Sequence, residues 1–386
     1  MRFRFGWTTL LAVLVAFGLA APGFAQDFDT KAQFAVLMDY ETGSILYNKN
    51  ADERLEPASM AKLMTLAVVF TYIQQNKLKL DDEFFISEHA WRDGGASSGG
   101  STMFAVLNSK IRVEDLIKGV IVQSGNDAAI ALAEGIGGTE QTFSKIENQL
   151  AKQIGLTASN FVNATGLPDP DQYSTAHDLA TLSRYIIKNF PEFYPIFSMP
   201  EFTWNKIKQP NRNSLLEVGI GVDGLKTGHT EESGYGEVVS APNDGRRLIA
   251  VLHGLKSMKE RAEEARKLIT WGMRGFELLP VYPEGKVVAY ANVFGGTKPS
   301  VGLIGKGRID LFVPKGTTNC PTATVTYRGP LRPPVEQGQE VAKLHVFCAG
   351  KEVQSTPLYA SETIEQGDIV RRSTDAAKQL LLGWLP

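Results

Sequence analysis

The chain has 386 residues, of which 43% are hydrophobic and 21% are charged, and its formal net charge is -2. A chain of this length exceeds the usual size of one domain, so we expect two folded units. The charge argues against a nucleic-acid partner, the composition is ordinary for a globular protein, and no repeat array is visible.

The N-terminal segment, residues 1–25, has the pattern of a secretory signal peptide. Two arginines precede an apolar run at 10–21, and small Gly23 and Ala25 stand before the expected cut. The run of about 12 residues is too short to cross a bilayer, which needs roughly 20. We therefore expect cleavage and export rather than an uncleaved membrane anchor.

Residues 26–276 are predicted to form one domain in which strands from both ends flank a helical centre. Runs at 34–40 and 44–47 predict a β-hairpin. Helical periodicity marks the segments 60–75, 113–119, 128–135, 142–155 and 175–188. The domain closes with an antiparallel strand pair and a charged helix, at 238–240, 247–252 and 258–274. This order indicates an α+β fold built on an antiparallel sheet.

The region 277–368 consists of short apolar runs separated by proline and glycine. Its clearest candidate strands are 286–290, 309–313 and 341–347, and together they predict a small all-β domain. Both cysteines, Cys320 and Cys348, fall here. In an oxidising compartment they are compatible with a structural disulfide, and equally with two buried free thiols.

The tail, 369–386, has a helical pattern with apolar residues on one face and basic residues nearby. The apolar positions are Ala377, Leu380, Leu381 and Trp384, and the basic ones are Arg371, Arg372 and Lys378. This pattern favours an amphipathic helix at a membrane surface. A helix docked on its own protein and a frayed chain end are the alternatives.

The first of three short motifs is Ser59-Met-Ala-Lys62, at the start of a nearly all-apolar helix. A serine hydroxyl is a weak nucleophile and needs a base within hydrogen-bond reach. Lys62 shares a helix face with Ser59, and burial together with the positive helix end disfavours its ammonium charge. Lys62 is therefore a candidate base, although this pattern alone is more often a helix cap and a solvated lysine.

The second motif is Ser124-Gly-Asn126, in a polar break between two helical segments. A loop at that position reaches into a cleft. We expect Ser124 to carry a proton between Lys62 and the leaving group, and the Asn126 amide to hold the substrate backbone. A turn that satisfies local backbone groups is the simpler alternative.

The third motif is Lys226-Thr-Gly228, which is predicted to open a strand. Lys226 offers fixed positive charge, Thr227 offers a hydroxyl, and Gly228 leaves room for a substrate along the strand edge. This combination suits a peptide carboxylate. In isolation, an exposed strand-end lysine explains it equally well.

Each motif occurs once in the chain, and in this order they form the active-site set of penicillin-interacting serine acyltransferases. From about 32 to 367 the chain resembles the D-alanyl-D-alanine carboxypeptidases, low-molecular-mass penicillin-binding proteins of the bacterial cell envelope. The segments that carry the resemblance are 57–64, 101–104, 163–167, 173–176 and 226–232.

The resemblance implies a β-lactamase/transpeptidase-like catalytic domain followed by a C-terminal β domain. It implies that Ser59 attacks the carbonyl between two terminal D-alanines of a peptidoglycan stem peptide, with Lys62 as base. The backbone amides of Ser59 and His229 would form the oxyanion hole, and water would hydrolyse the acyl-enzyme. Arg261 matches an additional carboxylate-binding arginine, although its charged surroundings alone predict solvated surface.

The same resemblance implies β-lactams as inhibitors, no metal or other cofactor, and export to the periplasm with the tail at the inner-membrane surface. The chain departs from the family at Gly236, which follows a Gly-Tyr pair where asparagine is usual. We infer no loss of activity from this departure. Residues 163–165 match a glycosylation acceptor, but we interpret them as a turn.

The sequence bears on four other functions. A class A β-lactamase lacks support because Glu-x-x-Leu-Asn is missing, and the nearest run, 147–151, fits an ordinary helix. None of the five histidines forms His-Glu-x-x-His, which disfavours a metallo-carboxypeptidase. A D,D-endopeptidase uses the same nucleophile and stays open, as does a non-catalytic wall-binding protein. The glycine-rich loop 94–101 is either a mobile rim of the cleft or a linker, and the cleft shape near it would decide between carboxypeptidase and endopeptidase. The loop does not end in Gly-Lys-Ser/Thr, so it is not a phosphate-binding loop.

Overall fold

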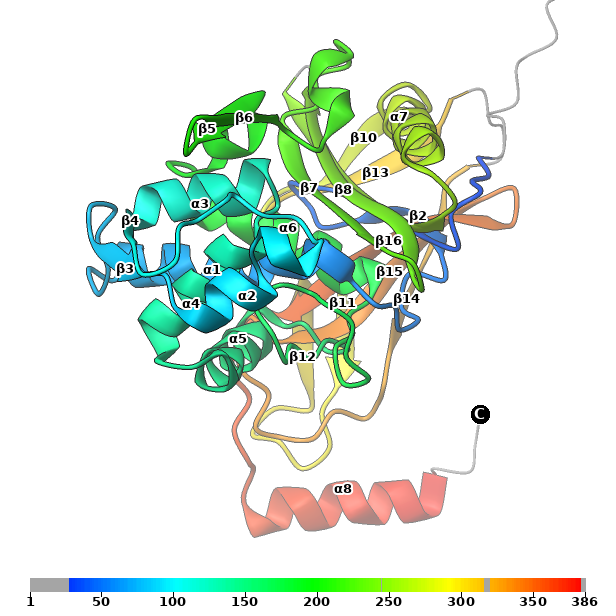
Figure 1. Ribbon diagram of the computed structural model, residues 1–386. Coiled ribbons are helices and arrows are strands. Elements are labelled where there is room, and N and C mark those ends of the chain that lie inside the picture. Colours follow the sequence, from blue (N-terminus) through cyan, green and yellow to red (C-terminus); the bar gives the residue numbers. More distant parts are fainter. Residues whose placement is uncertain (1–27, 244, 316–319, 383–386) are drawn as a thin grey trace, which may run out of the picture.

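The computed structural model describes residues 28–243, 245–315 and 320–382. The expected signal peptide, 1–25, lies outside them. Figure 1 shows helices α1 to α6 gathered on one side of a large sheet, with α7 on the other side. The helices are α1 (Lys62–Gln74), α2 (Glu88–Asp93), α3 (Val113–Val122), α4 (Asn126–Gly137), α5 (Glu140–Ile154), α6 (Ala176–Asn189), α7 (Met258–Arg274) and α8 (Ile369–Leu382). Short 3-10 turns are η1 (Ala58–Ala61), η2 (Ala96–Ser98), η3 (Tyr194–Ser198) and η4 (Ser214–Glu217).

The large sheet has ten strands, eight of them in the order β11-β12-β16-β2-β1-β9-β8-β7, with β15 on β16 and β14 on β15. Its strands pair antiparallel, and they are β1 (Phe34–Asp39), β2 (Ile45–Lys49), β7 (Gly224–Thr230), β8 (Gly234–Asn243), β9 (Arg246–Leu255), β11 (Ala289–Asn292), β12 (Ser300–Ile304), β14 (Thr322–Tyr327), β15 (Glu340–Cys348) and β16 (Lys351–Ala360). Three two-stranded sheets pair β3 (Glu83–Phe85) with β4 (Lys110–Arg112), β5 (Glu201–Trp204) with β6 (Ile207–Pro210), and β10 (Phe276–Tyr282) with β13 (Ile309–Pro314).

Strand β1 explains why the sheet is covered on both faces. Val36 and Met38 pack into the core beneath α1 to α6, whereas Ala35 and Leu37 pack into the core beneath α7. A strand buried on both faces has a continuous apolar sequence rather than an alternating one. The predicted hairpin of β1 and β2 is confirmed, as is the sheet assembled from both ends of the first region.

The predicted helices are present, with small changes at their ends. The helix expected at 60–75 begins as η1 and continues as α1, whose first nine residues are all buried. Helix α7 has the predicted bounds, because the Ser257 hydroxyl accepts a hydrogen bond from the Glu260 amide and so caps its start. The strand expected at 286–290 was placed too early. Lys286 closes a turn on the Pro283 carbonyl, and β11 begins only at Ala289.

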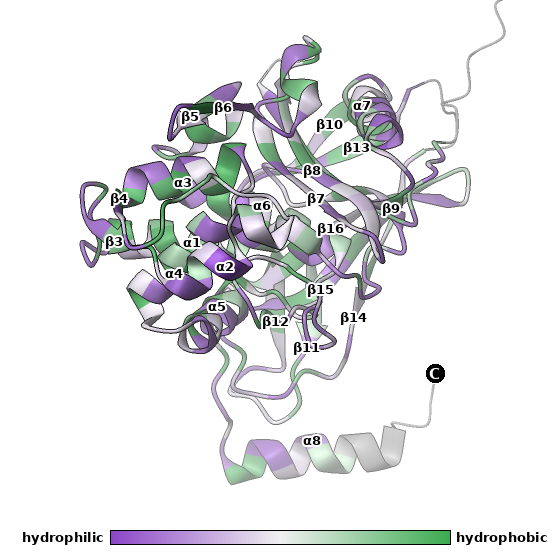
Figure 2. Ribbon diagram, viewed as in Figure 1, coloured by the Kyte–Doolittle hydropathy of each residue, from purple (hydrophilic) through white to green (hydrophobic). Residues whose placement is uncertain are grey.

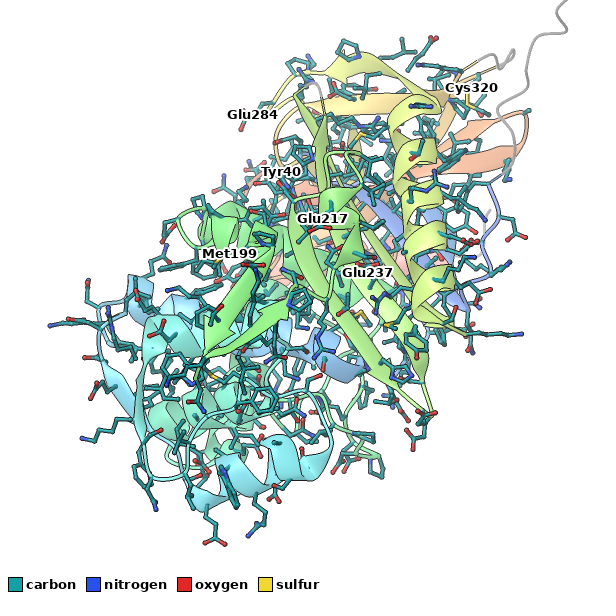
Figure 3. The ribbon with its side chains drawn as sticks, turned by 45° about the horizontal axis from the view of Figure 1, so that its top comes forward. Tyr40, Met199, Glu217, Glu237, Glu284 and Cys320 are labelled. Atoms are coloured by element: carbon teal, nitrogen blue, oxygen red, sulfur yellow. A yellow bond between two sulfur atoms is a disulfide. The ribbon has the colours of Figure 1, made fainter. Side chains whose placement is uncertain are left out.

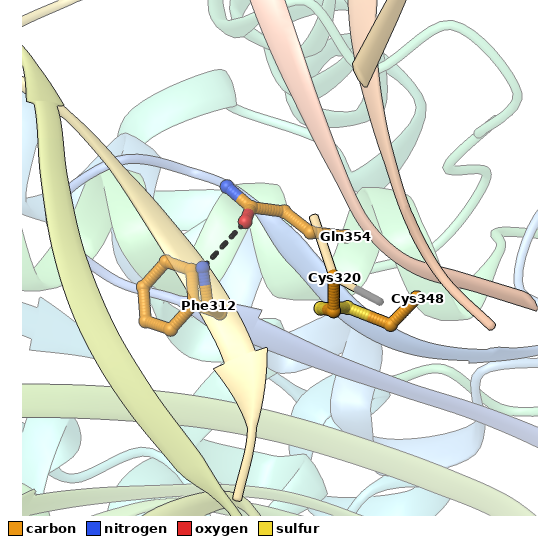
Figure 4. The surroundings of a disulfide bond; sticks show 4 residues. All are labelled: Phe312, Cys320, Cys348 and Gln354. Carbon is orange, nitrogen blue, oxygen red and sulfur yellow. Dashed lines mark hydrogen bonds between the residues drawn. A yellow bond between two sulfur atoms is a disulfide. The ribbon is translucent and has the colours of Figure 1, made fainter. Parts of the chain in front are cut away.

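The strands after 276 share a third core, and the α+β class with an all-β C-terminal region is confirmed. The large sheet crosses the expected boundary, because β16 pairs with β2 at Ser355 and Ile45. At this junction the Gln354 amide group donates to Thr356 Oγ1 at 2.7 Å and to the Asp310 carbonyl at 3.0 Å. Its oxygen accepts from the Phe312 amide at 2.8 Å (Figure 4).

Cys320 and Cys348 form a disulfide, which joins the start of the β14 segment to the end of β15 (Figure 4). The sequence left this pairing open because the distance between the two residues was not available from it. Their Cα atoms lie 4.6 Å apart, inside the range that a disulfide requires.

Helix α8 lies at one end of the molecule, apart from the other helices (Figure 1), and its described part carries both hydrophobic and hydrophilic residues (Figure 2). Its Asp375 carboxylate accepts from the Gly295 amide at 2.9 Å, while Ile369 and Val370 are about 70% exposed. The side chains expected to face a membrane beyond Ala377 lie outside the described set. Among the described helices, none has the length and apolar character needed to span a membrane.

Candidate active site

The segment around Ser59 presents its hydroxyl at the end of a buried helix. Ser59 belongs to η1 and is partly exposed, whereas Lys62, the first residue of α1, is fully buried. Ala58, just before the serine, has a φ of 48°, a conformation that costs a non-glycine residue of the order of 1 kcal/mol. Gly166 packs so closely on the Ala58 carbonyl that a Cβ there would lie 1.9 Å from it. Tertiary packing therefore holds the strained turn that aims Ser59.

Lys62 Nζ has three hydrogen-bond partners. They are Ser59 Oγ at 2.9 Å, Asn126 Oδ1 at 2.7 Å and the Thr165 carbonyl at 2.6 Å. Burial lowers the pKa of Lys62 to about 7, although nearby Asp127 raises it in part. A neutral amine can donate to the two other oxygens and accept from Ser59. The geometry thus suits a base that exchanges a proton with Ser59.

The Ser124 loop connects α3 to α4, as predicted. Ser124 has a φ of 59° and accepts a hydrogen bond from Lys226 Nζ at 2.8 Å. Two residues later, Asn126 opens α4 and directs its side-chain oxygen to Lys62. The loop therefore brings one hydroxyl to Lys226 and one amide to Lys62.

Strand β7 begins two residues before the predicted Lys226 start and carries all of the third motif. Burial lowers the pKa of Lys226 well below its usual value, and the Lys62 charge lowers it further. Burial therefore disfavours the charge of Lys226, which the sequence had predicted to be fixed. Gly228 faces η1, where an added Cβ would lie 3.0 Å from the Pro57 carbonyl, so glycine permits this close approach of strand to nucleophile.

The glycine-rich loop 94–101 packs directly on the second motif. Its Gly94 and Ser101 carbonyls accept the backbone amides of Asp127 and Asn126, at 3.1 and 2.8 Å. The buried Asp127 carboxylate also accepts the Met103 amide at 2.9 Å. These bonds hold both ends of the loop against the second motif, while residues 96–100 between them are exposed.

Thr165 is a functional residue that the sequence did not single out, because it acts through a backbone carbonyl. Asn163 Oδ1 accepts the amides of Thr165 and Gly166, at 3.2 and 2.8 Å, which confirms the turn expected here. Glu140 fixes the same segment by accepting the Ala164 amide at 3.0 Å. The turn thereby places the Thr165 carbonyl on Lys62. The resemblance at 163–167 was the available signal.

Arg261 is 5% exposed, so the solvated surface that its charged neighbours suggested is wrong. One face of α7 is turned to the sheet, and there Arg261 Nε lies 3.6 Å from Glu237 Oε2 on β8. Glu237 is opposite Thr227 in the register of β7 and β8. Arg261, Thr227 and Glu237 are therefore neighbours, and Glu237 is a second residue that the sequence did not identify.

His229 and Gly236 lie further along the same two strands. The exposed His229 ring stacks on Tyr235 with centroids 3.8 Å apart, so it is the His229 backbone that lines the sheet beside η1. A Cβ at Gly236 would lie 2.2 Å from the buried His253 ring. The usual asparagine has no room here, because His253 occupies its space.

These residues form one constellation of a nucleophile, a candidate base, a second hydroxyl and several cations. Such a set is suited to acyl transfer onto Ser59 from a substrate with a carboxylate. Across residues 28–243, 245–315 and 320–382, no group of three His, Cys, Asp or Glu side chains is arranged to hold a metal ion.

Comparison with known proteins covers both parts of the chain. A family model described as D-alanyl-D-alanine carboxypeptidase matches residues 21–257, and one described as penicillin-binding protein 5, C-terminal domain, matches residues 276–366. Arg261 lies between the two matched segments.

Individual relatives match over nearly the same span. D-alanyl-D-alanine carboxypeptidase DacC of Escherichia coli (strain K12) is 40% identical over 353 residues, which are 90% of this chain and 88% of that protein. D-alanyl-D-alanine carboxypeptidase DacA of Haemophilus influenzae is 40% identical over 347 residues, which are 89% of this chain and 88% of that protein. The crystal structure of penicillin binding protein 5 from Haemophilus influenzae has a TM-score of 0.69 at 40% identity, and covers 88% of this chain and 99% of that one.

Proposed function

This chain belongs to the D-alanyl-D-alanine carboxypeptidase family of serine peptidases, and we propose that it removes the terminal D-alanine from peptidoglycan stem pentapeptides through an acyl-enzyme on Ser59. The observation that carries this proposal is the 2.9 Å contact between Ser59 Oγ and the buried Nζ of Lys62. A base whose pKa is lowered to about 7 accepts a proton at neutral pH without holding it too tightly.

Acylation begins with attack of Ser59 Oγ on the carbonyl between the two D-alanines, while neutral Lys62 takes the hydroxyl proton. The negative oxygen of the tetrahedral intermediate is stabilised by the backbone amides of Ser59 and His229. As the C–N bond breaks, Ser124 relays a proton from Lys62 to the departing amine. It gives its own hydroxyl proton to the amine and takes the proton held by Lys62, which becomes neutral again. The contact of Ser124 with Lys226 at 2.8 Å orients the Ser124 hydroxyl for that step.

Substrate binding depends on both ends of the cleft. The Asn126 side chain holds the peptide backbone, and Gly228 lets the substrate lie along β7. The terminal carboxylate binds among Lys226, Thr227 and Arg261. These roles are supported by the burial of both cations, since a buried cation binds an anion more strongly than a solvated one.

Deacylation completes the cycle. Water attacks the ester carbonyl, Lys62 accepts its proton and returns it to Ser59 Oγ, and the shortened peptide leaves as a carboxylate. A β-lactam acylates the same serine, but we expect slow release because, within residues 28–243, 245–315 and 320–382, no glutamate is hydrogen-bonded to Ser59. Glu147, the nearest match, is buried on α5 and accepts from the Thr65 hydroxyl at 2.9 Å.

We also propose that residues 1–25 direct export, that 26–276 and 277–368 are the catalytic and spacer domains, and that 369–386 attaches the protein to the outer face of the cytoplasmic membrane. The exposure of the apolar Ile369 and Val370 at the start of α8 supports the last point. A protein truncated after 368 should then fail to co-sediment with anionic vesicles that retain the mature chain. Equal sedimentation of both would contradict the attachment.

The proposed activity is tested by D-alanine release from a soluble peptide ending in D-Ala-D-Ala, in the presence of a chelator. We expect release by the mature chain and none by Ser59→Ala. Loss of release in the chelator would instead indicate a metal-dependent reaction. A folded wild-type protein that releases no D-alanine would favour a cross-link endopeptidase or a non-catalytic wall-binding protein.

A further inference from the structure

Glu237 is a buried carboxylate beside the residues expected to bind the substrate carboxylate. It has 0% exposure, and neither of its oxygens has a hydrogen-bond partner. Arg261 Nε is 3.6 Å from Oε2, which is too long for a hydrogen bond. Figure 3 shows Glu237 on the sheet alongside α7. A buried acid held by charge alone is weakly compensated for its desolvation, so its position calls for an explanation.

The charged groups that face Glu237 come from each element packed around it. Arg261 reaches it from α7, and Lys226 acts on it from β7. Arg212, before η4, accepts a hydrogen bond from Arg261 through its carbonyl, and its own side chain is exposed. His253 on β9 packs against Gly236 on the opposite face, and burial lowers its pKa to about 4. Arg261 and Lys226 are thus the two basic side chains that act on Glu237.

We infer that Glu237 is the internal counter-ion of Arg261 in the empty cleft and that it takes up a proton when the C-terminal carboxylate of the substrate binds there. The inference rests on the proposed function, which supplies a substrate with that carboxylate. Binding consumes one proton from solvent, which forms an O–H bond on Glu237, and no other covalent bond changes. Glu237 is a positioning residue, since it acts on the substrate through Arg261.

The electrostatics give this coupling its direction. Burial raises the pKa of Glu237 to about 7, although Arg261 and Lys226 lower it in part. A second carboxylate at Arg261 raises that pKa further. Below about pH 7, Glu237 is already neutral and Arg261 is available to the substrate. Above it, each binding event requires proton uptake, so the substrate KM rises by up to tenfold per pH unit.

Lys62 imposes the opposite pH dependence on the chemical step. Its neutral form accepts the Ser59 proton, so acylation accelerates as the pH rises through about 7. The two effects together predict a bell-shaped kcat/KM with a narrow maximum near neutral pH. The alkaline limb belongs to Glu237 and appears in KM, whereas the acid limb belongs to Lys62 and appears in kcat.

The experiment measures kcat and KM for D-alanine release between pH 5.5 and 8.5, with the mature chain, Glu237→Gln and Glu237→Asp. Glutamine imitates the protonated acid, so Glu237→Gln should have a KM that is flat within about twofold, whereas that of the wild type rises at least about tenfold from pH 6.5 to 8.5. Glu237→Asp should restore a KM that rises with pH. Glu263→Gln, at a half-exposed acid on α7, the helix that carries Arg261, is the matched control and should behave as wild type.

A second measurement uses only the unmodified enzyme and a peptide that ends in an amide instead of a carboxylate. Its KM should not rise with pH, because no anion enters the site. The inference is overturned if the wild-type KM is flat for the carboxylate peptide, if the rise persists in Glu237→Gln, which would assign it to Lys226, or if the amide peptide shows the same rise. Absence of D-alanine release at every pH would instead refute the proposed function.

Discussion

At the active site, several of the buried polar side chains are ionisable and one of them, Glu237, has no hydrogen bond, whereas at the junction of β2 and β16 the buried Gln354 is neutral and fully bonded. Lys62 and Lys226 are buried lysines whose pKa values are lowered by burial, and Glu237 has no hydrogen bond. At the junction, Gln354 is equally buried but has partners for both of its side-chain atoms. The buried ionisable groups of the active site lower the stability of the fold but can take part in a reaction. The hydrogen-bonded amide at the junction stabilises the fold and has no such reactivity.

The largest expected effect is a loss of acylation rate, without a loss of stability, when the candidate base Lys62 is replaced. Lys62→Met should slow acylation by a penicillin roughly 10³-fold, because Ser59 loses its proton acceptor. Its melting temperature should stay the same or rise, since an amine that is costly to bury has been removed. Stopped-flow acylation and calorimetry measure the two quantities. The control Lys152→Met, at an exposed position on α5, should change neither the acylation rate nor the melting temperature. A marked loss of stability in Lys62→Met would contradict the difference drawn between the active site and the junction.

The next effect is the pH dependence of the chemical step. The rate of acylation at saturating peptide does not depend on the affinity for the substrate carboxylate. This rate should fall about tenfold for each pH unit below about 7 and level off above it. The sign follows from the base, because the protonated fraction of Lys62 grows as the pH falls. A single-turnover assay of acyl-enzyme formation between pH 5 and 9 measures it. A rate that rises toward acid pH would exclude Lys62 as the base.

A smaller effect is expected from the disulfide, and on stability alone. Cys320 and Cys348 enclose a sequence separation of 28 residues, so the paired change Cys320→Ser and Cys348→Ser should lower the free energy of unfolding by about 3 kcal/mol. D-alanine release per folded molecule should be unchanged. Denaturant titration and the peptide assay together check this, with reduced wild-type protein as the control.

The smallest effect is expected at the junction itself. Gln354→Leu removes the partners of the Phe312 amide and the Asp310 carbonyl, and should lower the free energy of unfolding by about 2 kcal/mol. Gln337→Leu, at an exposed position, should have little effect. If Gln354→Leu also reduced kcat for peptide release by more than about twofold, the active site and the junction would not be independent.

The sequence predicted the parts of the site that consist of reactive side chains only a few residues apart in the chain. Ser59 and Lys62 are three residues apart, and their contact follows from helical geometry. Arg261 was recognised only by resemblance, because a charge-rich helix gives no sign of which face is buried. The Thr165 carbonyl could not be found from residue types, since every residue carries that group.

By itself, the sequence determined the family, the order of the three motifs, the hairpin that starts the sheet and the bounds of α7, because each depends on local pattern. Only the tertiary structure decided that Lys226 meets Ser124, that Glu237 lies beside Arg261, that the two cysteines pair and that β16 extends the sheet of β2. These contacts join residues far apart in the chain. Their pairing and burial, and hence their charge states, are set by how the chain packs rather than by neighbours in sequence.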